Sequence, residues 1–175
     1  MSVYKTIAEL GSKFVGKSKL FKYGFNYSPM YRRSTAKIID ISEDLLNVTV
    51  KLPISYKNKN YVNSIFGGSM FSAVDPIPMI QLMNLLGNDF VVWDKAAEIY
   101  FKKPAKENLF ADFVYTMSEI DEIKARVESE NEIEITTITK LTNLDRTVTY
   151  CEVKKTIYIA VKSFYIEKKK LKNRQ

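Results

Sequence analysis

The chain has 175 residues, of which 46% are hydrophobic and 27% charged, a composition typical of one globular domain. It contains no histidine and only one cysteine, which excludes Ser-His-Asp and Cys-His catalysis, histidine metal sites and structural zinc sites. Any chemistry must therefore use carboxylates, hydroxyls, lysines or backbone N–H groups, and we expect neither a metal nor a cofactor. A single cysteine, Cys151, also allows no internal disulfide, which favours a reducing compartment.

The net charge of +7 is concentrated at the two ends of the chain. Residues 1–37 hold eight Lys or Arg and one Glu, and residues 167–174 hold five basic side chains and one acidic. Such charge suits nucleic acid, an acidic membrane surface or a phosphorylated ligand. Because these basic residues lie at the ends of the chain, we interpret them as solvent-exposed termini and expect no nucleic-acid partner. No apolar leader opens the chain, and we expect a cytoplasmic protein.

Apolar residues recur at helical spacing through the first twenty positions and predict an N-terminal helix. Such a helix can lie on a membrane surface, but two glycines weaken it in isolation, so docking on its own domain is favoured. Residues 23–35 are rich in aromatic side chains and contain Arg32 and Arg33. We expect them to form a loop that covers a core edge or a ligand cleft, with stacking on nucleic-acid bases as the alternative.

Six later segments alternate apolar and polar residues as β-strands do. The acidic segment 118–130 instead keeps helical spacing, and Ser118 with Asp121 resembles a capping box. This segment is predicted to be a short inserted helix. The predicted strands are 36–41, 46–52, 91–102, 109–117, 132–142 and 147–162.

The stretch 67–86 is apolar on nearly every side, which is typical of a buried helix. It is long enough to span a membrane, but Asp75, Gln81, Asn84 and two prolines argue against stable membrane insertion. The chain is therefore predicted to be α+β, with a long antiparallel sheet of about six strands around one central helix. We divide it into an N-terminal helix and aromatic loop, a single domain and a basic C-terminal tail, at residues 1–35, 36–162 and 163–175.

The residues that open the central helix resemble a known family. Asn60-Tyr-Val-Asn63, followed by Phe66-Gly-Gly-Ser-Met-Phe-Ser-Ala-Val-Asp75, is similar to the motif of hotdog-fold thioesterases of the phenylacetic-acid-pathway (PaaI-like) type. Those proteins carry His-Gly-Gly, six further residues and then an acid, the spacing found here. Ile99-Tyr-Phe-Lys-Lys-Pro104 is similar to the strand that follows the helix in that superfamily. The resemblance covers about residues 30–162 and implies the hotdog fold.

Other segments look closer still to an uncharacterised branch, known mainly as a domain of unknown function. They are Asn58-Lys-Asn-Tyr-Val, Phe66-Gly-Gly, Val74-Asp-Pro and Val92-Trp-Asp-Lys-Ala-Ala97.

The resemblance implies an acyl-CoA thioesterase whose two subunits build the site together. Backbone N–H groups at Gly67 and Gly68 would hold the oxyanion of the thioester, because a helix N-terminus presents free donors. Asp75 would activate water or attack the thioester, and Ser72 would position water. The implied partners are an acyl-CoA substrate and a second copy in a homodimer, joined through the strand at 91–102, or a tetramer. Candidates for substrate contacts are Asn63, Phe66, Arg32, Arg33, Lys102 and Lys103.

Structural alternatives remain for the same residues. Asp75 precedes Pro76 and can cap a second helical segment that starts at a kink. Gly67 and Gly68 can simply form a tight turn with positive φ. Phe66 stands where the family has histidine, so a non-catalytic acyl- or small-ligand-binding hotdog protein is the alternative function.

Two further features favour structural roles. The segment Trp93-Asp94-Lys95 is predicted to be a buried aromatic beside an ion pair rather than a substrate contact. The stripe of Met70, Met79 and Met83 is predicted to be core, and it can also floor an acyl pocket.

Overall fold

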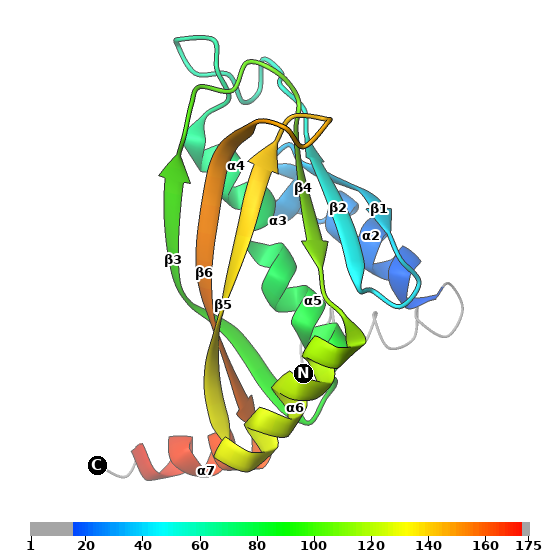
Figure 1. The fold of residues 1–175 in the computed structure, drawn as a ribbon, viewed down its shortest axis with the longest axis vertical. Coiled ribbons are helices and arrows are strands. Elements are labelled where there is room, and N and C mark those ends of the chain that lie inside the picture. Colours follow the sequence, from blue (N-terminus) through cyan, green and yellow to red (C-terminus); the bar gives the residue numbers. More distant parts are fainter. Residues whose placement is uncertain (1–15, 173–175) are drawn as a thin grey trace.

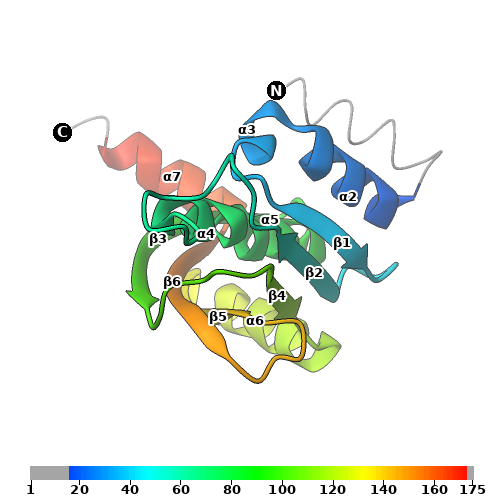
Figure 2. The same cartoon turned by 90° about the horizontal axis from the view of Figure 1, so that it is seen from above.

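The computed structural model describes residues 16–172, in which a six-stranded antiparallel sheet curls around two consecutive helices (Figures 1 and 2). The sheet order is β1-β2-β4-β5-β6-β3. Most of the predicted N-terminal helix lies outside the described residues. The strands are β1 (Lys37–Ile41), β2 (Asn47–Leu52), β3 (Phe90–Phe101), β4 (Leu109–Val114), β5 (Glu132–Thr142) and β6 (Thr149–Val161). All six strand predictions are therefore confirmed to within a few residues.

The predicted central helix is present, but it is broken into α4 (Gly67–Val74) and α5 (Pro76–Leu86). Proline cannot donate the hydrogen bond that continues a helix, so a break at Asp75 is the expected result of the two prolines that follow it. Side chains from other elements hold this break: the Tyr31 hydroxyl donates to Ala73 O at 2.9 Å, and the Lys155 ammonium donates to Asp75 O. Gly87, with a φ of 92°, ends α5 in a conformation that favours glycine.

The core divides along the central helices. Met70, Ala73 and Ile77 pack with α2, β1, β2 and β4, whereas Leu82 and Leu86 pack with α6, β5 and β6. All five of these side chains are buried. The sheet therefore encloses α4 and α5 along their length, and the boundary between the two halves of the core lies within α5, between Ile77 and Leu82.

One edge of the sheet is covered and the other is open. The Asn26 side chain, on α2 (Lys17–Tyr27), donates to Ile38 O of β1 at 2.9 Å and accepts from Ile38 N at 2.8 Å. Backbone groups on the β1 edge are thereby satisfied, as a protected edge requires. The opposite edge strand, β3, is exposed on most of its length. The described residues thus leave β3 as the edge available for pairing.

Two expectations about the helices need correction. The segment expected to be an aromatic loop at 23–35 is mostly helical, because α2 continues to Tyr27 and α3 covers Pro29–Arg32. The capping box of α6 (Met117–Glu130) is formed by Thr116 and Glu119, two residues before the predicted pair. The basic tail is helical over α7 (Lys162–Lys172). In residues 16–172, no helix combines the length and the apolar character that a membrane crossing requires.

We predict that Asn26→Ala lowers the free energy of unfolding by about 1–3 kcal/mol, because it leaves a backbone donor and acceptor of β1 without partners. Asn84→Ala is the matched control, since the Asn84 side chain is exposed and bonds only Ile80 O of its own helix. Its cost should stay within about 0.5 kcal/mol. Urea unfolding of the three proteins measures both values, and equal losses would contradict the role given to Asn26.

Candidate active site

The N-terminus of α4 carries two glycines because two phenyl rings lie against it. A Cβ atom on Gly67 would stand 2.7 Å from the ring of Phe101, and one on Gly68 would stand 2.3 Å from the ring of Phe66. Neither glycine has a positive φ, so the tight-turn alternative is wrong and close approach is the physical reason for both. No side chain caps this helix within the described residues. Its first N–H groups are therefore available to an acceptor.

Phe66 is held in place by the preceding loop. Its N–H donates to Asn58 O at 2.8 Å, and the buried Asn58 side chain donates to Thr35 Oγ1 at 2.7 Å and to Pro53 O at 2.8 Å. Phe66 and Phe101 are nevertheless 58% and 56% exposed. The start of α4 thus presents donors framed by open apolar surface.

Asp75 and Asp94 share one buried cation. Lys155 of β6 has a side chain only 3% exposed, and its ammonium lies 2.8 Å from Asp75 Oδ1 and 2.7 Å from Asp94 Oδ2. The side chains of Asp75 and Asp94 are 39% and 28% exposed. A buried ammonium is stable only when paired in this way. The cluster has one positive and two negative charges, and its two partly exposed carboxylates can present oxygen atoms to solvent.

Burial raises the pKa of the Asp94 carboxyl, although the hydrogen bond and positive charge of Lys155 oppose that rise. Asp94 comes from the inward face of β3, close to a bulge between Asp94 and Ala96 in the pairing with β6. The bulge is a local irregularity of the kind often found next to functional sites. We conclude that the broken central helix, β3 and β6 together fix the positions of these two carboxylates.

Asp75 does not act as a helix cap. No side-chain hydrogen bond from it caps α5, and its backbone is helical, with φ −50° and ψ −52°. The capping alternative is therefore wrong. Its carboxylate instead faces Lys155, so the residue has a structural role of a different kind, as an ion-pair partner.

Three other predicted site residues, Ser72, Lys102 and Lys103, lie on α4 or beside its start. Ser72 donates its hydroxyl proton to Gly68 O at 2.8 Å, so the oxygen keeps only acceptor capacity for water. Lys102 and Lys103 follow Phe101 and lie beside the start of α4, with the Lys102 ammonium 5.3 Å from the centre of the Tyr100 ring. All three basic or hydroxyl side chains are exposed.

Arg32 and Arg33 lie at the end of α3, whereas Asn63 lies in the loop before Phe66. The two arginines are exposed and end α3 just before Thr35, which Asn58 joins to Phe66 through the hydrogen bonds given above. Asn63 is exposed and has a φ of 60°. The fold brings the arginines toward the Phe66 loop, whereas Asn63 lies in the turn between Asn60 and Ser64.

The sequence interpretation missed Lys155 and misjudged its neighbours. Lys155 occupies an inward position between the buried Val153 and Ile157, and this interruption of an apolar row is the signal that was available. Trp93 is not buried: it is 46% exposed and lies against Tyr158 and Tyr165 on the other face of the sheet. Asp94 pairs with Lys155, whereas the adjacent Lys95 pairs with Glu134.

Comparison with known proteins gives a family and a fold. A family model described as Domain of unknown function (DUF4442) matches residues 17–159. A Pseudomonas aeruginosa protein of unknown function, described as a probable thioesterase, aligns with a TM-score of 0.71 at 16% identity over 82% of this chain and 95% of that one. A protein of unknown function from Chlorobaculum tepidum aligns with a TM-score of 0.62 at 14% identity, over 91% and 94% of the two chains.

Zebra fish thioesterase superfamily member 2 aligns with a TM-score of 0.56 at 15% identity, over 81% of this chain and 94% of that one. A search of curated proteins finds no match. At these identities the likeness concerns the fold alone. It confirms the hotdog arrangement expected from the sequence.

We predict that Lys155→Met lowers the free energy of unfolding by roughly 2–3 kcal/mol at pH 7, because two neighbouring carboxylates lose their cation. We expect a smaller loss of unfolding free energy than for a fully buried pair, because both carboxylates are partly exposed. Removing Lys155 removes the interactions that lower the pKa of Asp94, so this pKa should rise further. A raised carboxyl pKa favours the folded state as the pH falls, and the difference between variant and wild type should shrink toward pH 4.

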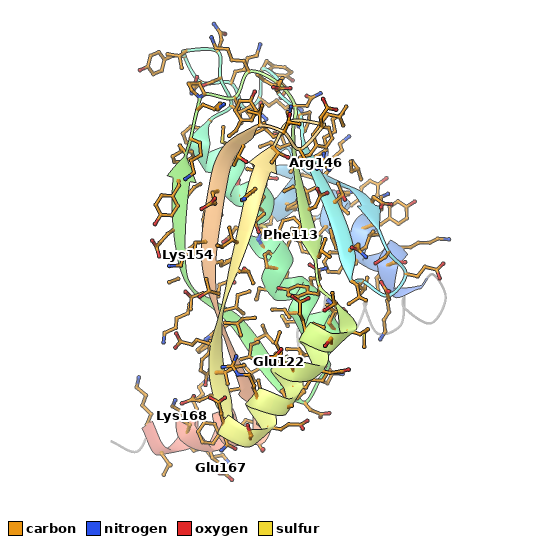
Figure 3. The ribbon with its side chains drawn as sticks, in the orientation of Figure 1. Phe113, Glu122, Arg146, Lys154, Glu167 and Lys168 are labelled. Atoms are coloured by element: carbon orange, nitrogen blue, oxygen red, sulfur yellow. The ribbon has the colours of Figure 1, made fainter. Side chains whose placement is uncertain are left out.

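Lys154→Met is the matched control. Lys154 lies on the other face of the same strand, is 45% exposed and pairs with Glu98 at 3.3 Å (Figure 3). An exposed pair of this kind contributes about 0–1 kcal/mol. Chemical unfolding at several pH values gives the comparison, and a Lys155→Met protein as stable as the control would show that the cluster is not a stabilising ion pair.

Proposed function

The chain belongs to the DUF4442 family, and from the geometry at α4 and α5 we propose that it is a hydrolase of acyl-CoA-type thioesters. The observation that carries the proposal is that one helix has uncapped N–H groups at Gly67 and Gly68 at its start and a partly exposed Asp75, paired with Lys155, at its end. The thioesterase descriptions of two structural neighbours support the same reaction class. Lys102 and Lys103 beside the glycines suit the phosphates of a CoA carrier.

In the proposed reaction, the thioester oxygen accepts hydrogen bonds from the N–H groups at Gly67 and Gly68. Asp75 takes a proton from water, whose oxygen bonds to the carbonyl carbon. The tetrahedral oxyanion is stabilised by the same N–H donors and the partial positive charge of the helix end. Collapse breaks the C–S bond, and the proton that Asp75 took from water passes to the departing sulfur. The products are a carboxylic acid and a thiol, and the Asp75 carboxylate is restored. Lys155 keeps Asp75 in position.

A single subunit does not bring these groups together. Gly67 and Asp75 are eight residues apart on one helical path, about 12 Å at the usual rise per residue. General bases act within hydrogen-bonding distance, or through one water. We therefore propose that Asp75 of a second copy faces the glycines, in a homodimer joined through the open edge of β3. The covered edge at β1 supports this choice of strand.

A non-catalytic acyl-binding protein is the second candidate. Two observations favour it. Phe66 stands where the PaaI-like thioesterases that the sequence resembles have histidine, and Asp75 is already paired with Lys155. Binding of acyl-CoA without turnover would identify this function.

We predict that Asp75→Asn reduces hydrolysis of acyl-CoA by about 100-fold or more, the scale expected for loss of a positioned base. The melting temperature should change little, because the amide oxygen still accepts from Lys155 and Asp94 still supplies a negative charge. Purified protein assayed against acyl-CoA thioesters of varied chain length measures the rate. Asp121→Asn on the exposed surface of α6 is the control and should keep the wild-type rate.

Unchanged turnover in Asp75→Asn would refute the catalytic assignment. Absence of turnover in both proteins, with binding of acyl-CoA retained, would favour the second candidate.

We predict that the wild-type protein is a dimer at micromolar concentration and that Ala96→Lys weakens it, because two new charges would meet across the paired β3 edges. Ala96 is exposed on this edge strand. Ile138→Lys is the control: Ile138 is 59% exposed but lies on β5, inside the sheet. Sedimentation velocity distinguishes the species, and a wild-type monomer would remove both the dimer and the shared site.

A further inference from the structure

One end of the molecule carries apolar side chains that project into solvent. Two segments, 53–66 and 102–108, connect β2 to α4 and β3 to β4 and lie together at this end, which we call the tip (Figure 1). Segment 53–66 extends beyond the ends of the strands. Within it Tyr61 is 98% exposed, Tyr56 86% and Val62 50%. Single exposed apolar residues are ordinary, whereas several that gather on one projecting loop indicate an interaction site.

Hydrogen bonds hold the tip in one shape. Asn60 Oδ1 accepts from Val62 N at 3.1 Å, and Asn60 N donates to Ser64 O at 2.8 Å. The two segments are joined by Ile65 N, which donates to Ala105 O at 2.8 Å, and both of these residues are buried. The apolar side chains are thus presented on an ordered turn, so a partner that takes them up does not have to order the loop first.

The charge of the tip is positive. Its one acidic residue is Glu107, whose carboxylate accepts from the Tyr150 hydroxyl. Its lysines are all exposed, and none of them forms an ion pair within residues 16–172. These lysines are Lys57, Lys59, Lys102, Lys103 and Lys106. The tip therefore attracts an anionic partner to the place where its apolar side chains project.

An anionic lipid surface fits these two properties better than a protein or a nucleic acid does. A stable protein interface takes about 20–30 residues from each side, whereas the apolar side chains here stand on one projecting loop. Surfaces that bind nucleic acid favour arginine, whose planar fork matches phosphate, and the tip contains none. At a bilayer surface, by contrast, tyrosine rings lie at the level of the headgroups and lysines are attracted to anionic lipids.

We propose that the tip is a docking surface for an anionic membrane. Tyr56, Tyr61 and Val62 enter the headgroup layer, and Lys57 and Lys59 lie among the lipid phosphates. Docking is peripheral, because a loop rather than a spanning helix makes the contact. The residues at 56–62 take no part in the proposed thioester hydrolysis, so docking is independent of that reaction.

Vesicles of phosphatidylcholine with about one-third phosphatidylglycerol are the probe, and vesicles of phosphatidylcholine alone are the control. In cosedimentation, the full-length protein should bind the anionic vesicles at least about tenfold more tightly than the neutral ones. Equal binding to the two kinds of vesicle would overturn the proposal.

The double variant Lys57→Ala with Lys59→Ala should raise the Kd for anionic vesicles about tenfold or more, because each lysine near such a surface contributes roughly fivefold. The matched control is Lys17→Ala with Lys19→Ala, which makes the same change in net charge at two exposed positions of α2. Its Kd should stay within about twofold of wild type, since these lysines lie outside the tip. Equal losses in the two double variants would show that net charge binds the lipid without the tip, and would overturn the proposal.

Entry of the apolar side chains is tested separately, because any basic protein can adhere to anionic vesicles by charge. Trp93 is the one tryptophan of the chain and lies near the start of β3, whereas the tip follows the end of this strand. Trp93→Phe with Tyr61→Trp therefore places a single fluorescent reporter at the tip. Its emission should move to shorter wavelength on anionic vesicles and be quenched by brominated lipid, whereas wild-type emission from Trp93 should show neither effect.

Tyr61→Ala should raise the Kd for anionic vesicles about fivefold or more without affecting the fold, since its side chain is almost fully exposed. Tyr27→Ala is the matched control on α2, where the ring is 71% exposed, and should leave the Kd unchanged. An emission at the tip that stays unchanged on binding would overturn the proposal. Tighter binding of single-stranded oligothymidylate than of anionic vesicles would also overturn it, and would assign the tip to nucleic acid.

Discussion

A buried ammonium connects the three parts of the molecule on which the candidate site depends. Lys155 extends from the middle of β6 to the break in the central helix, where it meets Asp75, and to the edge strand β3, where it meets Asp94. Removing a lysine from water is costly unless carboxylates compensate, so neither acid can move far without leaving the cation unpaired. The position of β3 relative to the helix is thereby fixed by electrostatics as well as by packing. The same interaction leaves the cluster with excess negative charge at a partly exposed surface.

The start of α4 shows how a helix end can stay open inside a folded domain. Its donors are framed by the rings of Phe66 and Phe101, which are accessible and require glycine beneath them. In the family that this sequence resembles, histidine stands at the position of Phe66. A phenyl ring supplies no proton, so the proposed catalysis relies on the backbone donors and on a carboxylate. The proposed reaction and the binding alternative therefore differ in the role of Asp75.

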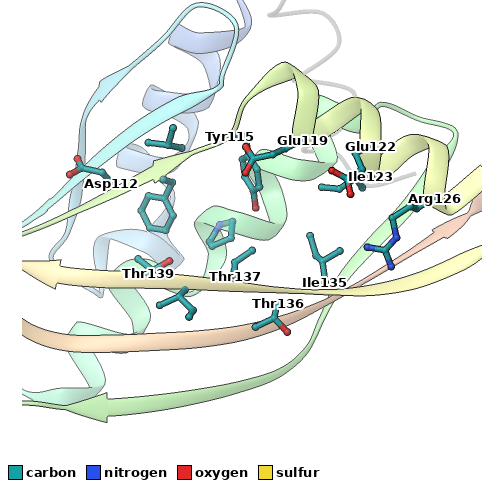
Figure 4. A pocket seen from close by; sticks show the side chains of 14 residues that line it. Asp112, Tyr115, Glu119, Glu122, Ile123, Arg126, Ile135, Thr136, Thr137 and Thr139 are labelled. Atoms are coloured by element: carbon teal, nitrogen blue, oxygen red, sulfur yellow. The ribbon is translucent and has the colours of Figure 1, made fainter.

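Backbone groups of the sheet are left unpaired at two places, between β4 and β5 and along the open edge of β3. At β3, unpaired backbone faces solvent along an extended strand, which suits another strand. Between β4 and β5, the unpaired edges border a cavity that has both apolar and charged lining residues (Figure 4). At the β1 edge, by contrast, the Asn26 side chain satisfies the N–H and C=O groups of Ile38. The open edge of β3 is thus the place at which a partner copy is proposed.

The sequence by itself determined the fold class, the order of the strands along the chain and the apolar helix at their centre. Alternation, proline positions and the Gly67-Gly68 spacing to Asp75 are local properties, and local backbone preferences express them directly. It did not determine that Asp75 would pair with Lys155, eighty residues away, because register between distant strands sets that contact. Nor did it determine that β4 and β5 would separate. Only the tertiary structure decided these features, since each depends on how α6 and the broken helix pack against the sheet.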